Sequence, residues 1–212
     1  MSFSSKFMGK YSRYSIVLLM QAGYSLLNPV SALANPEDSV TRSPNLSQAS
    51  IGSSKVTAAN FPVLPATVNL IKQHEGFRPY AYIDSSGLPV IGYGQTRVNG
   101  QTVSMGQYIT QADADAALEQ ELYHIQSLVL NSVRVDLNPH QLGALTSLVY
   151  NAGTRVVTQS TLSRKLNAGD FAGAASEFPR WNKANQGGQL VEFPGLTKRR
   201  LDEQKLFLTP SY

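Results

Sequence analysis

The sequence of 212 residues contains no cysteine. It can therefore form neither a disulfide scaffold nor a zinc–cysteine site, and it has no cysteine nucleophile. It has 18 basic and 14 acidic residues, but three of the basic residues and none of the acidic ones lie within residues 1–34. The rest of the chain has 15 basic against 14 acidic residues, a net charge of +1. It therefore lacks the clustered positive charge expected of a nucleic-acid-binding protein.

Residues 1–34 have the order of a secretory signal peptide, with a basic start, an apolar stretch and small residues at the end. The apolar stretch, residues 15–27, is shorter than the roughly 20 residues that a membrane-spanning helix needs. Ala32-Leu33-Ala34 has the A-x-A form of a signal-peptidase site. We expect a secreted or periplasmic protein with no membrane attachment after cleavage. The alternative is an uncleaved signal anchor, which tethers the same domain to the membrane.

Residues 35–62 are rich in Ser, Asn and Thr and show no apolar periodicity, so we expect a disordered linker before one domain, residues 63–212. Helix signals are frequent in this domain. Pro65 opens a helix that Gly76 closes, and Thr110 with Asp113 resembles a capping box before a helix over 111–131. Further helices are predicted from Asn138 to Gly153, from Ser160 to about 167, from Asp170 through Phe178, and over about 196–207.

Strand signals lie between the first two helices, in AYID (81–84), PVIGYG (89–94) and RVNGQTV (97–103). Asn99-Gly100 between alternating residues is a strong hairpin signal. We expect these segments to form a small three-stranded antiparallel sheet. The predicted fold class is therefore α+β, with a small sheet lobe, a larger helical lobe and a cleft between them that suits an extended ligand.

Two carboxylates, Glu75 and Asp84, occupy the ends of the first helix and the first strand. Ile71, Phe77 and Tyr80 flank Glu75, and apolar surroundings favour the protonated carboxyl that a general acid needs. Asp84 precedes a Ser-Ser-Gly turn, where solvent and backbone donors keep a carboxylate ionised. One protonated and one charged carboxyl group across a cleft is the arrangement that cleaves glycosidic bonds.

The segment EGFRPYAYIDSSGLPVIGYGQT (75–96) closely resembles the catalytic segment of phage-type lysozymes (glycoside hydrolase family 24, the endolysin and muramidase family). Four later segments resemble the helical lobe of that family in the same order: QLGALTSLVYNAG, STLSRKLNAGD, AASEFPRW and GLTKRRLDEQKLF. The resemblance covers residues 63–208. It implies a lysozyme-like fold, hydrolysis of the β-1,4 bond between N-acetylmuramic acid and N-acetylglucosamine in peptidoglycan, and no cofactor.

The resemblance places the general acid at Glu75 and the second carboxylate at Asp84. The family's third catalytic position, a threonine six residues after the aspartate, is Val90 here, and valine has no hydroxyl to hold an attacking water. Two hypotheses follow. The first is an active, secreted lysozyme, whose inverting mechanism needs the carboxyl groups roughly 6.5–9.5 Å apart. The second is a peptidoglycan-binding homologue with weak or lost catalysis, for which Val90 is the reason.

Other residues of this segment could support the site or bind substrate. Arg78 could pair with Glu75 and orient it, or it could be an ordinary solvated arginine. Gly92 could let the backbone approach a sugar closely. Tyr93 and Gln95 are further candidates, and Gln95 replaces the histidine that often follows GYG in the family.

In the helical half, Asn151 could face the cleft or simply end its helix, and Trp181 is expected to pack in the core rather than stack on a sugar. His74-Glu75 lacks the second histidine of an H-E-x-x-H motif, so no metal site is predicted. Lys198-Arg199-Arg200 is predicted to be a solvated helix face, or alternatively a patch that attracts the anionic cell wall. The expected partner is the glycan strand of peptidoglycan, with no nucleic acid, and the expected state is a monomer.

Overall fold

The computed structural model describes residues 62–84 and 86–210. The predicted signal peptide and residues 35–61 of the predicted linker lie outside this part. Within it, no helix is both long and apolar enough to cross a membrane. The small lobe follows α1 (Pro65–Glu75) and contains two hairpins, made by β1 (Arg78–Ile83) with β2 (Pro89–Gly92) and by β3 (Arg97–Val98) with β4 (Gln101–Thr102).

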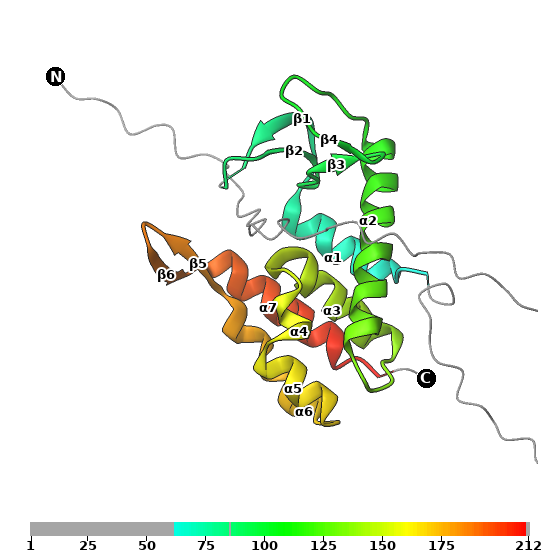
Figure 1. The fold of residues 1–212 in the computed structure, drawn as a ribbon, viewed down its shortest axis with the longest axis vertical. Coiled ribbons are helices and arrows are strands. Elements are labelled where there is room, and N and C mark those ends of the chain that lie inside the picture. Colours follow the sequence, from blue (N-terminus) through cyan, green and yellow to red (C-terminus); the bar gives the residue numbers. More distant parts are fainter. Residues whose placement is uncertain (1–61, 85, 211–212) are drawn as a thin grey trace, which may run out of the picture. The chain divides into compact units, whose positions relative to one another are not determined.

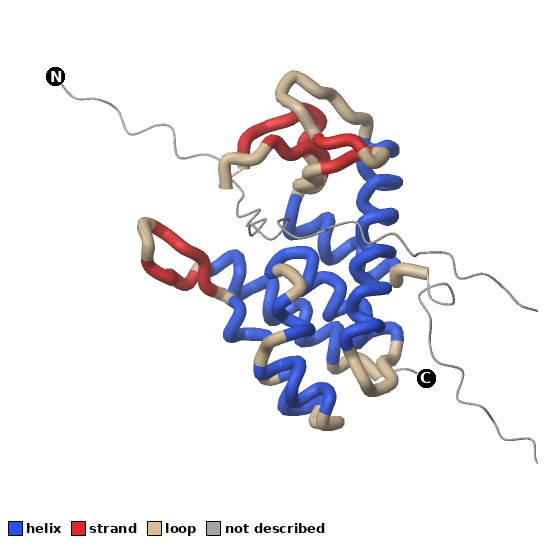
Figure 2. Tube along the Cα trace, viewed as in Figure 1, coloured by secondary structure: helices blue, strands red, loops and turns tan. Residues whose placement is uncertain are grey.

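The long helix α2 (Gln111–Ser132) runs from the small lobe into the helical lobe (Figure 1). The helical lobe is built from α3 (Pro139–Ala152), α4 (Arg155–Thr158), α5 (Thr161–Asn167), α6 (Phe171–Ala175), the 3₁₀ helix η2 (Phe178–Trp181) and α7 (Pro194–Phe207). A third hairpin, β5 (Lys183–Gln186) with β6 (Gln189–Glu192), joins η2 to α7 (Figure 2). Neither α4 nor this hairpin was expected from the sequence.

Local side-chain hydrogen bonds fix the starts of the main helices. Thr110 caps α2 by accepting a hydrogen bond from the backbone N–H of Asp113, and Asn138 forms a complete capping box with Gln141 at the start of α3. The first helix ends at Gly76, whose φ of 71° suits a residue without a Cβ. The predicted ends of these three helices are thus confirmed within a residue. The helix expected through Phe178 is shorter, because the chain changes to 3₁₀ geometry around Pro179.

The expected single sheet of three strands is wrong, although the α+β class is right. β1 and β2 form one antiparallel pair, with Tyr82 opposite Val90, and β3 and β4 form a separate pair around Asn99-Gly100. Between the pairs the chain folds back on itself, so that Ile91 and Gln95 exchange backbone hydrogen bonds of 2.9 and 3.0 Å. This tight turn prevents the second pair from extending the first.

Two apolar cores underlie the two lobes, and α2 connects them. The helical core surrounds α3, whose apolar residues at helical spacing are buried as predicted: Leu142, Leu145, Leu148 and Val149. The core of the small lobe is formed by residues such as Ile71 and Leu118. Ile125 of α2 packs against both cores. The lobes are therefore held on one continuous helix, which positions the end of α1 against the helical lobe.

Candidate active site

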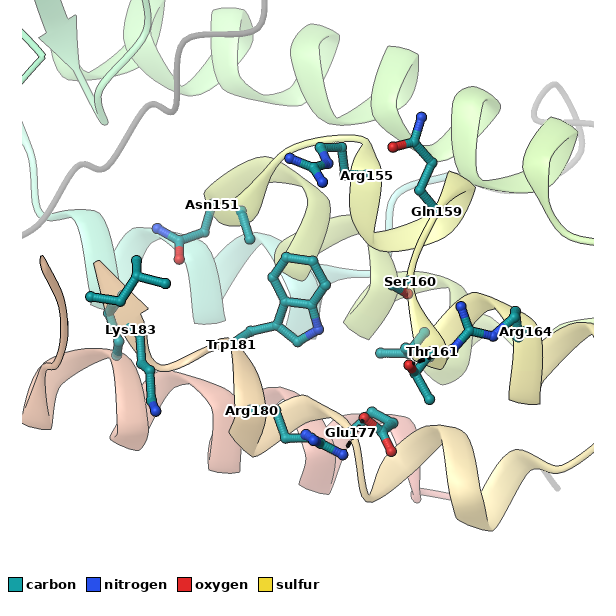
Figure 3. Close-up of a pocket in the computed structure, with 14 residues that line it drawn as sticks. Asn151, Arg155, Gln159, Ser160, Thr161, Arg164, Glu177, Arg180, Trp181 and Lys183 are labelled. Atoms are coloured by element: carbon teal, nitrogen blue, oxygen red, sulfur yellow. Dashed lines mark hydrogen bonds and ion pairs between the residues drawn. The ribbon is translucent and has the colours of Figure 1, made fainter. Parts of the chain in front are cut away.

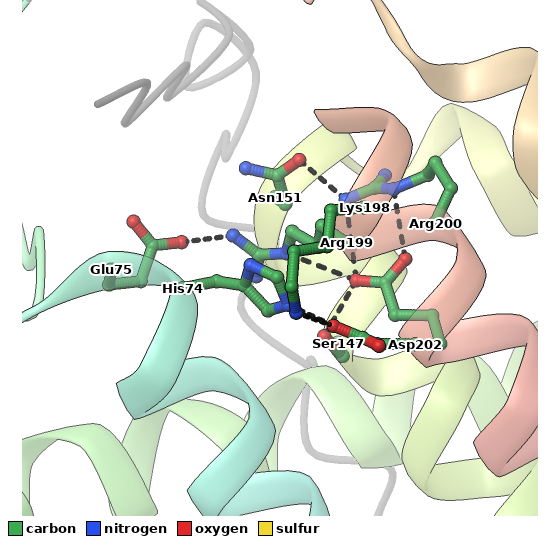
Figure 4. Close-up of polar contacts among 9 residues, drawn as sticks. His74, Glu75, Ser147, Asn151, Lys198, Arg199, Arg200 and Asp202 are labelled. Carbon is green, nitrogen blue, oxygen red and sulfur yellow. Dashed lines mark hydrogen bonds and ion pairs between the residues drawn. The ribbon is translucent and has the colours of Figure 1, made fainter. Parts of the chain in front are cut away.

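Glu75 is the last residue of α1, and its side chain is only 3% exposed. The guanidinium of Arg199, from α7, donates a hydrogen bond of 2.5 Å from Nη1 to Glu75 Oε1 (Figure 4). The sequence predicted burial among apolar side chains but not this cationic partner. Glu75 is therefore held in one orientation by a contact between two residues that are 124 positions apart.

Arg199 and Arg200 are 2% and 0% exposed, so the predicted solvated face of Lys198-Arg199-Arg200 is wrong for two of its three residues. Lys198 alone is solvated, and it pairs with Asp202 one turn later. Glu203 compensates both buried arginines, with Oε1 3.1 Å from Arg199 Nε and Oε2 3.0 Å from Arg200 Nε. The i,i+4 and i,i+3 spacing of these residues is the signal by which the sequence could have revealed them.

The charges of this network are stabilised in different ways. Burial opposes the charge of Arg199, but the carboxylates of Glu75 and Glu203 outweigh it and raise its pKa. Burial lowers the pKa of Arg200 to about 10, although Glu203 opposes this effect. Ser147 donates a hydrogen bond of 2.7 Å to Glu203 and so fixes the shared carboxylate. Through Arg199, the network supports the orientation of Glu75.

Asp84 lies at the turn of the β1–β2 hairpin and is buried, with 9% exposure. Its Oδ1 accepts three hydrogen bonds, from the backbone N–H and the hydroxyl of Ser86 at 2.9 and 2.7 Å and from the backbone N–H of Leu88 at 3.0 Å. The expected backbone donors are thus present, whereas the expected solvent exposure is not. Oδ2 is also buried and has no hydrogen-bond partner among the described residues.

Val90 is fully buried on β2. It is opposite Tyr82 on β1. The backbone N–H of Asp84 donates to the carbonyl of Leu88, so the same register places Asp84 opposite Leu88. Because every second residue of a strand points to the same face, the side chains of Asp84 and Val90 project from the same face of the hairpin. Diagonal neighbours of this kind lie about 7–8 Å apart. The substituted third position is therefore adjacent to the second carboxylate.

The family model for phage lysozymes matches residues 72–203, which include Glu75, Asp84 and the whole Arg199–Glu203 network. The chain belongs to the phage lysozyme family. It is 41% identical over 138 residues to an endolysin of Acyrthosiphon pisum secondary endosymbiont phage 1, an alignment that covers 65% of this chain and 92% of the relative. The predicted family is thus confirmed.

Solved structures support the same assignment. An endolysin from Escherichia coli O157:H7 phage FAHEc1 superposes with a TM-score of 0.66 at 33% identity, covering 72% of this chain and 96% of that structure. The muramidase domain of SpmX from Asticaccaulis excentricus superposes with a TM-score of 0.63 at 36% identity, covering 70% and 98%. These likenesses confirm the lysozyme-like fold and support a glycosidase that acts on peptidoglycan.

In this phage lysozyme family member, Gly92 and Gln95 build the turn after β2. Gly92 has a φ of 66°, and a Cβ there would lie 2.4 Å from Gln95 Oε1. Gln95 is buried, accepts a hydrogen bond of 2.7 Å from the backbone N–H of Tyr93 and donates one of 3.0 Å to the carbonyl of Ala114 on α2. Both ends of its amide are therefore used to attach the turn to α2, which is a supporting role.

Tyr93 is likewise buried and joins three elements. Its hydroxyl donates a hydrogen bond of 2.7 Å to Asp115 of α2, and Asp115 is 2.8 Å from Lys72 Nζ of α1. Its carbonyl accepts a hydrogen bond of 3.0 Å from the hydroxyl of Tyr150 on α3. Burial and then Asp115 raise the pKa of Tyr93 to about 12, so the phenol is neutral. Tyr93 thus supports the site.

Arg78 lies on β1 opposite Gly92, and its guanidinium carbon is 4.2 Å from the centre of the Tyr82 ring. This is a cation–π contact, which stabilises a protein by about 0.5–1 kcal/mol at exposed positions. The expected pairing of Arg78 with Glu75 stays a prediction. Glu75 forms an ion pair with Arg199.

Asn151 lies at the end of its helix, one of the two alternatives considered for it, and its place in the cleft between the lobes stays a prediction. It lies in the last turn of α3, where its Oδ1 accepts a hydrogen bond of 2.7 Å from Arg200, and it also lines a cavity of about 590 Å³ in the helical lobe (Figure 3). Trp181 packs partly against the helical core, as expected, but it also faces this cavity. Four cationic side chains line the same cavity: Arg155, Arg164, Arg180 and Lys183.

Proposed function

We propose that this protein is a secreted lysozyme that hydrolyses the β-1,4 bond between N-acetylmuramic acid and N-acetylglucosamine in peptidoglycan. The observation that carries this proposal is the pair of buried, individually anchored carboxyl groups, Glu75 on Arg199 and Asp84 on its turn, in a member of the phage lysozyme family. The known activities of the endolysin and muramidase relatives support the reaction class.

In the proposed mechanism Glu75 is the general acid. Its carboxyl proton passes to the glycosidic oxygen while the bond from that oxygen to the anomeric carbon breaks. Glu75 is left as a carboxylate, and the hydrogen bond from Arg199 stabilises it. Because Arg199 is itself buried and paired with Glu203, it holds the same position before and after the proton transfer.

Asp84 is the general base in this mechanism. Its Oδ1 is occupied by three donors, so Oδ2 accepts the proton of the attacking water, whose oxygen bonds to the anomeric carbon. Attack from the face opposite the leaving group inverts the configuration of that carbon. Val90 contributes no hydroxyl to this water, and this favours the second candidate function, a peptidoglycan-binding homologue with weak or lost catalysis.

The test is product analysis after incubation of the purified protein with insoluble peptidoglycan. A lysozyme releases soluble fragments whose new reducing ends are N-acetylmuramic acid, identified after borohydride reduction by mass spectrometry. Proton NMR during the first turnovers reports the anomer that forms first, and inversion predicts the α-anomer from a β-linkage. Binding to peptidoglycan without release of reducing ends would establish the second candidate function.

A further inference from the structure

Glu75 is the last residue of α1, and the chain turns away directly after it at Gly76. The last carbonyl groups of a helix have no partner inside the helix, and helix ends fray more easily than helix centres. At this end, the backbone N–H of Gly76 donates a hydrogen bond of 3.0 Å to the carbonyl of Lys72. A carboxyl group that must meet a substrate at a fixed place therefore needs support for the helix end that carries it.

A second contact between α1 and α7 lies directly beside the one at Glu75 (Figure 4). His74 Nε2 is 3.0 Å from Asp202 Oδ2, and the His74 side chain is 14% exposed. Asp202 follows Arg199 by three residues, and residues three apart lie on the same face of a helix. Consecutive side chains at the end of α1 thus reach one face of α7, Glu75 at Arg199 and His74 at Asp202.

The contact between His74 and Asp202 joins a neutral ring to a charged carboxylate near neutral pH. Burial, and then the positive charge of Arg199, lower the pKa of His74, although Asp202 opposes both effects. Burial opposes the charge of Asp202, but hydrogen bonds from Lys198 and His74 outweigh it and lower the pKa of this carboxyl group. Because an ionised carboxylate can only accept, Nε2 of His74 carries the hydrogen. Hydrogen bonds to a charged group are stronger than those between neutral groups.

This contact keeps its charges during the proposed reaction, whereas the ion pair at Glu75 does not. Glu75 begins the reaction as a neutral carboxyl group and ends it as a carboxylate. A neutral carboxyl group is attracted to Arg199 less strongly than a carboxylate. The contact with Arg199 is therefore weakest in the protonated state, which is the state that must meet the glycosidic oxygen.

We propose that His74 and Asp202 are positioning residues for Glu75, which hold the end of α1 against α7 while Glu75 is protonated. The inference rests on the proposed function, in which Glu75 is the general acid. Proton transfer depends on the place of one carboxyl group, and a misplacement of about 1 Å can cost on the order of 10²-fold. Loss of the contact should therefore slow the chemical step more than it weakens the binding of peptidoglycan.

The first test compares Asp202→Ala with Lys198→Ala in the full-length protein. Asp202→Ala removes the acceptor of the hydrogen bond from His74, whereas Lys198→Ala removes the other partner of Asp202 and leaves that bond in place. At saturating peptidoglycan, the rate of reducing-end release should fall by about 10-fold in Asp202→Ala, with the half-saturating concentration unchanged. Lys198→Ala is the matched control and should keep the wild-type rate. Asp202→Asn, whose amide oxygen still accepts, should recover most of the lost rate.

His74→Phe tests the other side of the contact, because it keeps a ring of similar size without the donor. It should lose as much rate as Asp202→Ala, and the double variant should lose no more than either single variant. Thermal melts define a temperature at which all variants are folded. A wild-type rate in folded Asp202→Ala, the same loss in Asp202→Asn, or additive losses in the double variant would overturn the proposal.

A second measurement needs no activity. The backbone N–H of Gly76 should exchange with solvent faster in Asp202→Ala than in Lys198→Ala, because the end of α1 that it closes is less firmly held. Equal exchange would also overturn the proposal. An inactive wild type with faster exchange in Asp202→Ala would contradict the proposed function but not the anchoring of α1.

Discussion

Val90 adjoins Asp84 on one face of the β1–β2 hairpin, at the position where this chain departs from its family. Val90→Thr adds a hydroxyl with little change in volume. If Asp84 alone holds the attacking water, a second contact should raise the rate of peptidoglycan cleavage with little change in binding, since a misplacement of about 1 Å can cost on the order of 10²-fold. Initial rates of reducing-end release measure this effect.

Thermal melts must accompany these rates, because position 90 is fully buried and an unpartnered hydroxyl there costs about 1–3 kcal/mol. Val103→Thr, at another buried valine of the small lobe, is the matched control and should lose stability without gaining rate. If folded Val90→Thr is no faster than the wild type, another group already positions the water. The second candidate function then loses its main support.

The raised pKa of Glu121, a partly exposed residue of α2, predicts how the free energy of unfolding depends on pH. Its pKa is about 7 in the folded protein, against 4.5 for an unperturbed glutamate. The folded state therefore binds more protons between these values, and the stability present below about pH 4.5 is lost as pH rises through 7. Glu121→Gln removes this loss, so its stability relative to the wild type should be greater at pH 8 than at pH 5, by on the order of 1–3 kcal/mol. Urea denaturation at both pH values measures the difference, and an equal relative stability would contradict the assignment.

At the scale of the elements, helix ends were predictable because their determinants are local. The hydrogen bonds of Thr110 with Asp113 and of Asn138 with Gln141 span three residues, so the sequence displays both partners. Strand pairing was less predictable, because the turn between Ile91 and Gln95 depends on contacts with α2, such as the bond from Gln95 to Ala114. The burial of Arg199 could not be predicted from the sequence of α7 alone, because it depends on the ion pair with Glu75 of α1.

The capping box of α3 gives a quantitative prediction for this element. Asn138→Ala removes the side chain that accepts the hydrogen bond from the backbone N–H of Gln141, and it should lower the free energy of unfolding by about 0.5–2 kcal/mol. Asn131→Ala, an exposed asparagine near the end of α2, should leave stability nearly unchanged or slightly raised. Urea titrations of both variants make the comparison. If Asn138→Ala is as stable as the wild type, tertiary packing alone fixes the start of α3.

For the whole molecule, local helix and strand signals in the sequence predicted the two lobes and their order, and the family resemblance assigned catalytic roles to the two carboxylates. The solvated face predicted at Lys198-Arg199-Arg200 is wrong for the two arginines, and this changes the charge that the helical half presents to solvent. Residues 155–212 carry a net charge of +4, but two of the positive charges, Arg199 and Arg200, are buried and paired with Glu75 and Glu203. The positive charge available to attract an anionic wall is therefore carried by other residues, among them those that line the cavity.

Export is a further prediction for the whole chain. Signal-peptidase cleavage after Ala34 predicts an exported protein that begins at Asn35. Intact-mass analysis of the protein recovered from the periplasm and the medium of an expressing bacterium tests it, with Ala32→Asp and Ala34→Asp together as a variant that blocks cleavage. A membrane-bound product that retains Met1 in the wild type would establish the signal-anchor alternative.

The central claim is that Glu75 donates the proton that breaks the glycosidic bond, and the most direct measurement is the rate of reducing-end release by Glu75→Gln. Glutamine retains hydrogen bonding to Arg199 but has no proton to transfer. General acid catalysis contributes about 10²–10⁴-fold, so the rate should fall by at least 10²-fold while binding to insoluble peptidoglycan persists. Glu119→Gln should keep the wild-type rate. A folded Glu75→Gln variant with the wild-type rate would contradict the account.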